Sequence, residues 1–497
     1  MKYRLTYDFG SGSVKAALSD KDFHLCGIEN APYPTYFPQV GWAEQKPEDH
    51  WQAMCAATHR LLQKTGVQPE QIEGIAMAQT GTTIIFVDEY GKPLYDCVMW
   101  MDGRADAQAE EINKKLGEKR FSGKNVYAKL LWFLQNKSDL VEKAQYMLDV
   151  SGFLFHRMTD QWVCEITGSR SNGLLNVEKR CWSPELFELI GFPRRLVPEK
   201  IITSTEQAGV LTEQAAAALG LRAETAVFGG CVDHATAMLG TGCIRPGDAH
   251  IYIGTSAWLA VGTAANAPNQ GRMPSPVPNM RYHFYDTDSG GSSIDYLIQT
   301  YYDREVAESM DAFSVMNKEI SQAQNDRNHE NVLFLPFLAG ASAPISNVTI
   351  RATLLNLTRS TKRQHIARAV MEGVCFNLRW MRDIHAEQNG WNINFLRGIG
   401  GGMQSEVFVQ MLADVLDTPL TPLQGPRFAG NLGLQACIEV GLGNAKDFSI
   451  LDNVVRCGKT YYPDKATQER YDRLYSFFRE SYSCTEDLYR RLNADKN

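Results

Sequence analysis

The sequence has little that would suit nucleic acid, a membrane or export. Basic residues do not predominate: 50 Lys and Arg stand against 57 Asp and Glu, a formal net charge of −7. A nucleic-acid binder needs a basic surface to displace the counterions of the phosphate backbone, so that class of partner is disfavoured. There is no run of roughly 18 apolar residues, so no membrane span is expected. The segment before Asp8 also lacks an apolar stretch of signal-peptide length.

Paired cysteines and the commonest nucleotide motifs are missing as well. The 11 Cys are scattered, none forms C-x-x-C, and none lies near a His at zinc-ligand spacing. Such cysteines are typical of free thiols in a reducing compartment, so we expect a cytoplasmic protein. Neither a G-x-x-x-x-G-K-[ST] phosphate loop nor a complete G-x-G-x-x-G occurs, which disfavours a P-loop and a Rossmann dinucleotide site.

What is present predicts a duplicated α/β protein. The 497 residues are 44% hydrophobic, enough for two large or three ordinary domains. A strand–turn–strand pattern occurs at about residues 3–18 and again at about 250–262, and each begins a stretch of alternating strands and helices. We expect two lobes with a cleft between them, divided between Gly240 and Asp248. Helices are predicted at 48–65, 106–116, 128–135, 293–303, 304–318, 364–387 and 406–415, and further strands at 72–78, 82–88, 225–228, 332–336 and 396–399.

Each strand–turn–strand unit holds a turn that could bind phosphate. In the first, the turn around Gly10, Ser11 and Ser13 exposes backbone N–H groups that can hold phosphate oxygens. Asp8 could hold Mg²⁺ and Lys15 could neutralise phosphate charge. The alternative is a plain hairpin, because a short Gly/Ser motif is a weak signal. The second turn, Gly254-Thr255-Ser256, is a weaker signal of phosphate binding when taken alone. The first turn strengthens this signal, since the two turns could face each other across a cleft.

A third segment places a carboxylate after a glycine turn. The predicted strand 225–228 runs into Gly229-Gly230, and Asp233 stands where a helix could start. Asp233 could be only a helix N-cap, or it could accept the proton of an attacking hydroxyl in phosphoryl transfer. His234 is better explained as a structural residue beside Asp233 than as the catalytic base, because an isolated histidine has many structural uses.

Two further groups of residues fit the two ends of such a reaction. Gly401 and Gly402, between a strand and a helix, would let the backbone approach a flat ligand such as adenine, or simply form a tight turn. A Trp can cover the apolar face of a sugar while polar side chains bond its hydroxyls. The candidates for this role are Gln79, Thr80, Trp100, Asp102 and Arg104. The alternative for the last two is a surface ion pair worth little energy.

The ordered set of motifs resembles the FGGY family of carbohydrate kinases, xylulokinase-like branch, in the actin-like, ribonuclease-H-like ATPase superfamily. The segments that carry the resemblance are DFGSGSVKAAL at 8–18, GWAEQKPEDHW at 41–51, WMDGR at 100–104, GGCVDHATAMLGTG at 229–242, IGTSAWLA at 253–260, LPFLAG at 335–340, ARAVMEGVCFNLR at 367–379 and GGMQSEVFVQMLADVLDTPL at 401–420.

The resemblance implies a fold and a set of roles. The fold would be two ribonuclease-H-like domains, mixed sheets flanked by helices, with an N-terminal sugar-binding lobe at 1–244 and a C-terminal nucleotide-binding lobe at 245–497. Asp8 and the Gly10–Ser13 turn would handle metal and phosphate, with Lys15 nearby; Thr255 and Ser256 would form the second phosphate loop. Gly401 and Gly402 would pack on adenosine. Asp233 would be the general base, ATP and Mg²⁺ would be required, and the protein would be a homodimer acting on a small ketose or polyol.

The sequence departs from the family pattern in two places. Xylulokinase-like members carry Met-His where Gln79 and Thr80 stand, so the substrate pocket is altered. Gly340-Ala341-Ser342-Ala343-Pro344 stands where relatives commonly carry Gly-Glu-Arg-Thr-Pro. These changes leave open a non-catalytic sugar or nucleotide sensor that uses the same cleft. A third interpretation is an actin-like or chaperone-type ATPase that acts on a protein, and the sugar-type residues around Trp100 argue against it.

Overall fold

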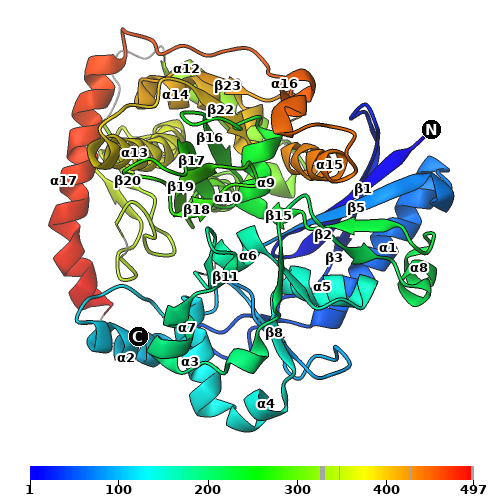
Figure 1. Ribbon diagram of the computed structural model, residues 1–497. Coiled ribbons are helices and arrows are strands. Elements are labelled where there is room, and N and C mark those ends of the chain that lie inside the picture. The colour runs from blue at the N-terminus through cyan, green and yellow to red at the C-terminus, as the bar shows by residue number, and fades with distance from the viewer. Residues whose placement is uncertain (172, 325–330, 346, 426–427, 494–497) are drawn as a thin grey trace. The chain divides into compact units, whose positions relative to one another are not determined.

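The computed structural model describes residues 1–171, 173–324, 331–345, 347–425 and 428–493, and the chain divides into two compact units (Figure 1). The first unit comprises Met1–Ile244, Met273–Met280 and Phe428–Val455; the second comprises Arg245–Arg272, Arg281–Arg427 and Arg456–Asn497. The expected single lobe over 245–497 therefore gives two of its segments to the first unit.

The main sheet of the first unit has the order β13-β14-β5-β1-β2-β3, with β15 also paired to β5. The hairpin β1–β2 and its neighbour β3 are antiparallel, whereas β5 runs parallel to β1, β14 and β15. The strands are β1 (Tyr3–Phe9), β2 (Ser13–Asp20), β3 (Leu25–Pro32), β5 (Ile72–Gln79), β13 (Gln207–Val210), β14 (Ala226–Phe228) and β15 (Cys231–Val232).

Helices cover both faces of this sheet because the side chains of β1 alternate. Leu5 and Tyr7 join the core beneath α1 (Pro47–Thr65), which packs on β2 and β3 and starts with a proline at its first position. On the other face, α15 (Ala429–Gly441) packs on β1 and β5. There Arg4 pairs with Glu439 at 2.7 Å. This packing is why the segment around α15 belongs to the first unit although it lies late in the sequence.

The rest of the first unit includes a separate apolar core between residues 84 and 197. Its strands are β4 (Glu44–Gln45), β6 (Ile85–Val87), β7 (Cys97–Val98), β8 (Tyr146–Leu148), β9 (Val163–Glu165), β10 (Leu175–Asn176), β11 (Cys181–Trp182), β12 (Lys200–Ile202) and β18 (Met273–Pro274). Its helices are α2 (Asp106–Leu116), α3 (Val126–Asn136), α4 (Ser138–Lys143), α5 (Val150–Thr159), α6 (Ile166–Ser171), α7 (Pro184–Ile190), α8 (Glu213–Leu219), α9 (Asp233–Gly240) and α16 (Leu451–Val454).

In the second unit, β19, β17, β16, β22 and β23 lie side by side in that order, with β22 parallel to both β16 and β23. The strands are β16 (Ala249–Ile253), β17 (Ala257–Ala264), β19 (Met280–Thr287), β20 (Leu333–Leu335), β21 (Thr353–Leu355), β22 (Leu396–Ile399) and β23 (Leu420–Pro422). The helices are α10 (Gly291–Tyr301), α11 (Asp303–Ala307), α12 (Ala312–Gln324), α13 (Arg363–Asn389), α14 (Glu406–Leu416) and α17 (Gln468–Leu492).

Several expected elements differ locally. The helix expected over 304–318 is broken into α11 and α12, where Ser309 takes a positive φ of 56° that a continuous helix cannot contain. The strand expected over 82–88 shortens to β6, and Thr82 has φ 56°. The long pattern over 364–387 is confirmed as α13, which buries Val370 and Val374.

Two expectations concerned features that the sequence lacks, namely paired cysteines and long apolar runs. All eleven cysteines are free thiols, as expected. No helix in the described part of the chain is both long and apolar enough to cross a membrane.

Candidate active site

Three parallel strands of the first unit end at one edge of its sheet. In the register of the sheet, Asp8 lies opposite Ala78, and Ala78 lies opposite Cys231. The residues that follow β1, β5 and β15 therefore emerge together. This edge collects Asp8 with the Gly10–Ser13 turn, Gln79 with Thr80, and Asp233, although these residues are far apart in the sequence.

The Gly10–Ser13 turn has its carbonyl oxygens occupied and two amides free. Tyr33 Oη donates to Gly10 O at 2.5 Å, and Gln45 Nε2 donates to Ser11 O at 2.7 Å. Among the residues that the structure describes, the N–H groups of Ser11 and Gly12 have no protein acceptor. Successive amides without acceptors form an anion-binding concavity, so this turn is equipped to hold a phosphate.

Asp8 lies beside this turn and pairs across the hairpin with Lys15. Their side chains are 3.3 Å apart, with 26% of the Asp8 side chain and 47% of the Lys15 side chain exposed. An exposed pair of this kind contributes little stability, so either group can exchange its partner for a ligand at small cost.

Two sequence motifs pack against each other and against the first turn. Trp100 Nε1 donates to Ser11 Oγ at 3.1 Å. The backbone N–H of Ala43 donates to Asp102 at 2.6 Å, which ties the segment at 41–45 to the one at 100–104. Trp100 is half-buried at this junction, so its ring lies next to the phosphate-type turn.

Asp102 and Arg104 are not the surface pair considered as an alternative. Both side chains are fully buried and lie 2.7 Å apart, and Arg104 also donates to Glu44 at 2.7 Å. The Arg104 guanidinium stacks 3.8 Å from the Trp42 ring. In this arrangement the two residues support the loop that carries Trp100, and direct contact of either with a sugar stays a prediction.

Lys129 on α3 supports the loop that carries Trp100, and the sequence pattern did not identify it. Its side chain is fully buried, and Nζ donates to the carbonyls of Met99 and Trp100 at 2.7 and 3.2 Å. Burial lowers the pKa of Lys129 to about 7. The only signal in the sequence is a lysine within an apolar helical stretch, 126–134.

Gln79 and Thr80 are largely inaccessible, at 2% and 9% exposure. Gln79 Oε1 accepts the backbone N–H of Ser151 at the start of α5 at 2.7 Å. The Gln79 side chain therefore positions α5, and a direct role in substrate binding stays a prediction.

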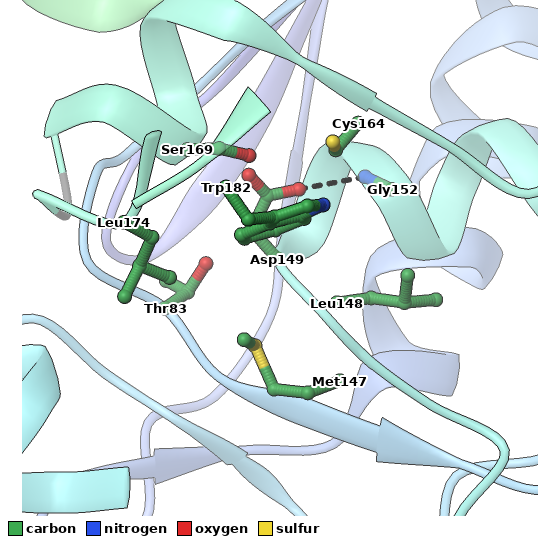
Figure 2. Close-up of a pocket in the computed structure, with 9 residues that line it drawn as sticks. All are labelled: Thr83, Met147, Leu148, Asp149, Gly152, Cys164, Ser169, Leu174 and Trp182. Atoms are coloured by element: carbon green, nitrogen blue, oxygen red, sulfur yellow. Dashed lines mark hydrogen bonds between the residues drawn. The ribbon is translucent and has the colours of Figure 1, made fainter. Parts of the chain in front are cut away.

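A small cavity lies at the start of α5, and Figure 2 shows Asp149 and Ser169 pointing into it. Asp149 Oδ1 accepts the N–H of Gly152, whereas Oδ2 has no hydrogen-bond partner among the residues that the structure describes. The cavity measures about 10 Å³, room for one water molecule and not for a sugar.

Asp233 is the first residue of α9 and is half-buried. The N-cap residue of α9 is Val232, whose side chain makes no capping bond. The interpretation of Asp233 as the N-cap is therefore wrong, because Asp233 lies one residue later. Asp233 Oδ1 accepts the N–H of the adjacent His234 at 2.7 Å. Burial lowers the pKa of His234 to about 3, so its imidazole is neutral at physiological pH.

The second unit repeats the arrangement of the first turn. Gly291 N–H donates to Gly254 O at 2.7 Å, and Ser292 N–H donates to Thr255 O at 2.9 Å. Within the described part of the chain, the N–H groups of Thr255 and Ser256 have no protein acceptor. Both hairpin turns thus keep their carbonyls occupied and present amides.

The glycine run after β22 lies at the same edge of this sheet, because Tyr252 is opposite Ile399 in the register. Gly400 has φ 95°, and a Cβ there would lie 2.3 Å from Ile253 O. A Cβ on Gly401 would meet nothing within 4 Å. The backbone at Gly401 is therefore open to close approach by a ligand, whereas Gly400 is needed for the turn itself.

Fold and site together define a class: a two-unit α/β protein of the ribonuclease-H-like, actin-like type. The model of the FGGY family of carbohydrate kinases, N-terminal domain, matches residues 3–240, and that of the C-terminal domain matches residues 249–436. The chain belongs to the FGGY family of carbohydrate kinases and is an ATP-dependent sugar kinase.

Relatives and solved structures agree on the family and differ in substrate. The chain is 26% identical to a xylulose kinase of Lactococcus lactis, over 99% of both chains. It is 25% identical to a gluconokinase of Bacillus subtilis, over 99% of this chain and 97% of the relative. A ligand-bound xylulose kinase from Lactobacillus acidophilus has the same fold, with TM-score 0.88, 21% identity, and coverage of 99% of this chain and 100% of that one.

Proposed function

We propose that this kinase transfers the γ-phosphoryl group of ATP to a hydroxyl of a small ketose or polyol, with a xylulose-like sugar favoured. The observation that carries the proposal is the meeting of Asp233, Asp8 and a turn with free amides at one sheet edge. A hydroxyl acceptor, a base and a phosphate-binding turn are the parts that phosphoryl transfer requires, since positioning and charge neutralisation supply most of the catalysis.

The phosphate end of the reaction would use both hairpin turns. The free amides at Ser11 and Gly12, and those at Thr255 and Ser256, would hold phosphate oxygens. Asp8 fits Mg²⁺, because this ion is usually bound through one or two carboxylates together with substrate phosphates and water. When bound, Mg²⁺ would neutralise phosphate charge. Lys15 would leave Asp8 and pair with a phosphate oxygen. Gly401 and Gly402 would pack against the adenosine.

The sugar end would lie against Trp100 and Asp233. Asp233 would accept the proton of the attacking hydroxyl as its oxygen bonds to the γ-phosphorus and the bond to the β-phosphate oxygen breaks. Arg104 is already bonded to two carboxylates, which leaves it unsuited to bind an aldonate carboxylate. This favours an uncharged ketose or polyol over gluconate.

Replacement of the proposed base tests the mechanism. We expect Asp233→Asn to lower kcat by about 10²–10⁴-fold while sugar and ATP still bind, because proton transfer is lost and the shape of the side chain is kept. Turnover is measured by ADP release, and binding by calorimetry. His234→Gln, a change at the adjacent buried residue, is the control for local disturbance. Near-normal turnover in Asp233→Asn would remove Asp233 from this role.

A substrate panel separates this function from a sensor that binds without turnover. Wild-type protein is given ATP with xylulose, other pentuloses, hexuloses, glycerol and gluconate. We expect ADP in equal amount to a phosphorylated ketose or polyol, and little with gluconate. Binding of sugar without ADP release would favour the sensor. We also propose that the protein is a homodimer. Light scattering on the same sample measures the molar mass, which should be twice that of one chain.

A further inference from the structure

The backbone immediately before Asp233 is held by a side chain from a distant part of the first unit. Val232, the last residue of β15, donates its N–H to Thr167 Oγ1 at 2.9 Å. Both residues are fully buried. Because the α9 N-cap makes no side-chain bond of its own, this contact fixes the chain where Asp233 begins the helix.

Thr167 is in turn oriented by a buried carboxylate. Its hydroxyl donates to Glu165 Oε2 at 2.6 Å, and a hydroxyl has one proton, so its lone pairs face the Val232 N–H. Glu165 Oε2 also accepts the N–H groups of Thr167 and Gly168 at 2.8 and 3.0 Å. Its Oε1 accepts the hydroxyl of Ser204 at 2.9 Å.

The hydrogen bonds around Glu165 favour its ionised form, whereas burial favours its neutral form. Glu165 is 1% exposed, and burial raises its pKa to about 8 while the hydrogen bonds oppose that rise. All four donated bonds end on carboxylate oxygens, and a proton on either oxygen would compete with one of them. Glu165 therefore acts as an acceptor for the whole turn.

The Glu165 side chain also lies against the glycine turn that leads into β15. Gly230 N–H donates to Ser204 O at 3.0 Å. A Cβ on Gly229 would lie 3.2 Å from Glu165 Cγ, and a Cβ on Gly230 would lie 2.0 Å from Met77 O. The segment before Asp233 is thus enclosed between β5 on one side and Glu165 with its partners on the other.

We infer that Thr167 and Glu165 are positioning residues for the phosphoryl transfer, which set the place of the Asp233 carboxylate through the backbone of Val232. The inference rests on the proposed role of Asp233. Neither residue touches the reacting atoms; they act by holding the strand end that carries the base.

The test compares Thr167→Val, which removes the hydroxyl and keeps the shape, with Thr167→Ser, which keeps the hydroxyl. We expect Thr167→Val to lower kcat on the order of tenfold, the scale of one lost hydrogen bond, with KM for sugar and ATP changed less than about twofold. Thr167→Ser should retain most of the turnover. Thr159→Val is the matched control: this buried threonine bonds the Phe155 carbonyl within α5, and its loss should leave kcat unchanged.

A double-mutant cycle separates positioning from general stability. In an Asp233→Asn background, Thr167→Val should cause no further loss of kcat, because the group that it positions is gone. An additional tenfold loss there would overturn the inference, as would wild-type kcat in Thr167→Val alone. Normal turnover in Asp233→Asn would show that the proposed base is wrong. Normal turnover in Thr167→Val, with turnover lost in Asp233→Asn, would show that only the positioning inference is wrong.

Glu165→Gln gives a second measurement. It should lower kcat in the same direction, because an amide presents N–H groups to donors that need an acceptor. If this variant does not fold, the serine and valine changes at Thr167 still decide the inference.

Discussion

Single buried residues hold the first phosphate-type turn in place. His50 is 1% exposed and its Nε2 lies 2.7 Å from Gln45 Oε1, while the Gln45 amide donates to Ser11 O. The turn thus depends on a histidine that is far from it in sequence. Burial lowers the pKa of His50 to about 4, so the folded protein holds it neutral.

This histidine predicts a loss of stability in acid. The pKa of His50 is lower in the folded than in the unfolded chain, where it is about 6.5, so unfolding takes up a proton as pH falls below 6.5. Stability from this residue is therefore complete above pH 6.5 and lost as pH falls towards 4. We expect His50→Gln to reduce the difference in unfolding free energy between pH 7.5 and pH 5 by about 2 kcal/mol, measured by urea unfolding.

His59 offers the control for that measurement, because it lies on the same helix and is exposed. His59→Gln should leave the pH dependence of stability as in the wild type. An unchanged pH dependence in His50→Gln would show that His50 is not held neutral.

At the scale of elements, the helix that begins with Asp233 is placed by close contact with α15. A Cβ on Gly433 would lie 2.6 Å from the carbonyl oxygen of Thr236, whereas a Cβ on Gly430 would lie 3.6 Å from the Thr236 side chain. Both glycines are in α15, one turn apart. At position 433, any residue larger than glycine would prevent the two helices from approaching this closely.

These two positions make a matched pair. We expect Gly433→Ala to destabilise the protein by about 1–3 kcal/mol, because the added methyl forces the helices apart. Gly430→Ala should be neutral or slightly stabilising, because alanine favours a helix and meets only ordinary contact there. Thermal unfolding measures both changes. Equal melting temperatures for the two variants would contradict the close packing of α9 on α15.

At the scale of the whole molecule, the proposed reaction requires residues of both units. Trp100 and Asp233 belong to the first unit, and Thr255 and Gly401 belong to the second. Water must be excluded while the phosphoryl group moves, since an open site would hydrolyse ATP. The proposal therefore needs a site that excludes water once both substrates are bound.

ADP release without sugar tests the exclusion of water. The rate of ATP hydrolysis should be far below the rate of phosphoryl transfer to xylulose, because a site that excludes water protects ATP from hydrolysis. Protein with xylulose but without ATP provides the blank. Equal rates with and without sugar would contradict the role given to water exclusion.

The sequence alone determined the family and the α/β class, and it supplied the site residues that remain predictions. The motifs around Asp8, Asp233 and Gly254 are local, and their glycines and carboxylates indicate turns at strand ends without further context. The strong periodicity of α13 and the proline at the start of α1 likewise depend only on neighbouring residues.

Only the tertiary structure decided which of these residues are free to act. It buried Asp102 and Arg104 with Glu44, turned Gln79 towards α5, and joined Thr167 to Val232 across 65 positions. It also moved α15 into the first unit, because a helix joins the sheet whose apolar face it covers. Burial and hydrogen-bond partners depend on segments distant in sequence, which is why no local pattern could predict them.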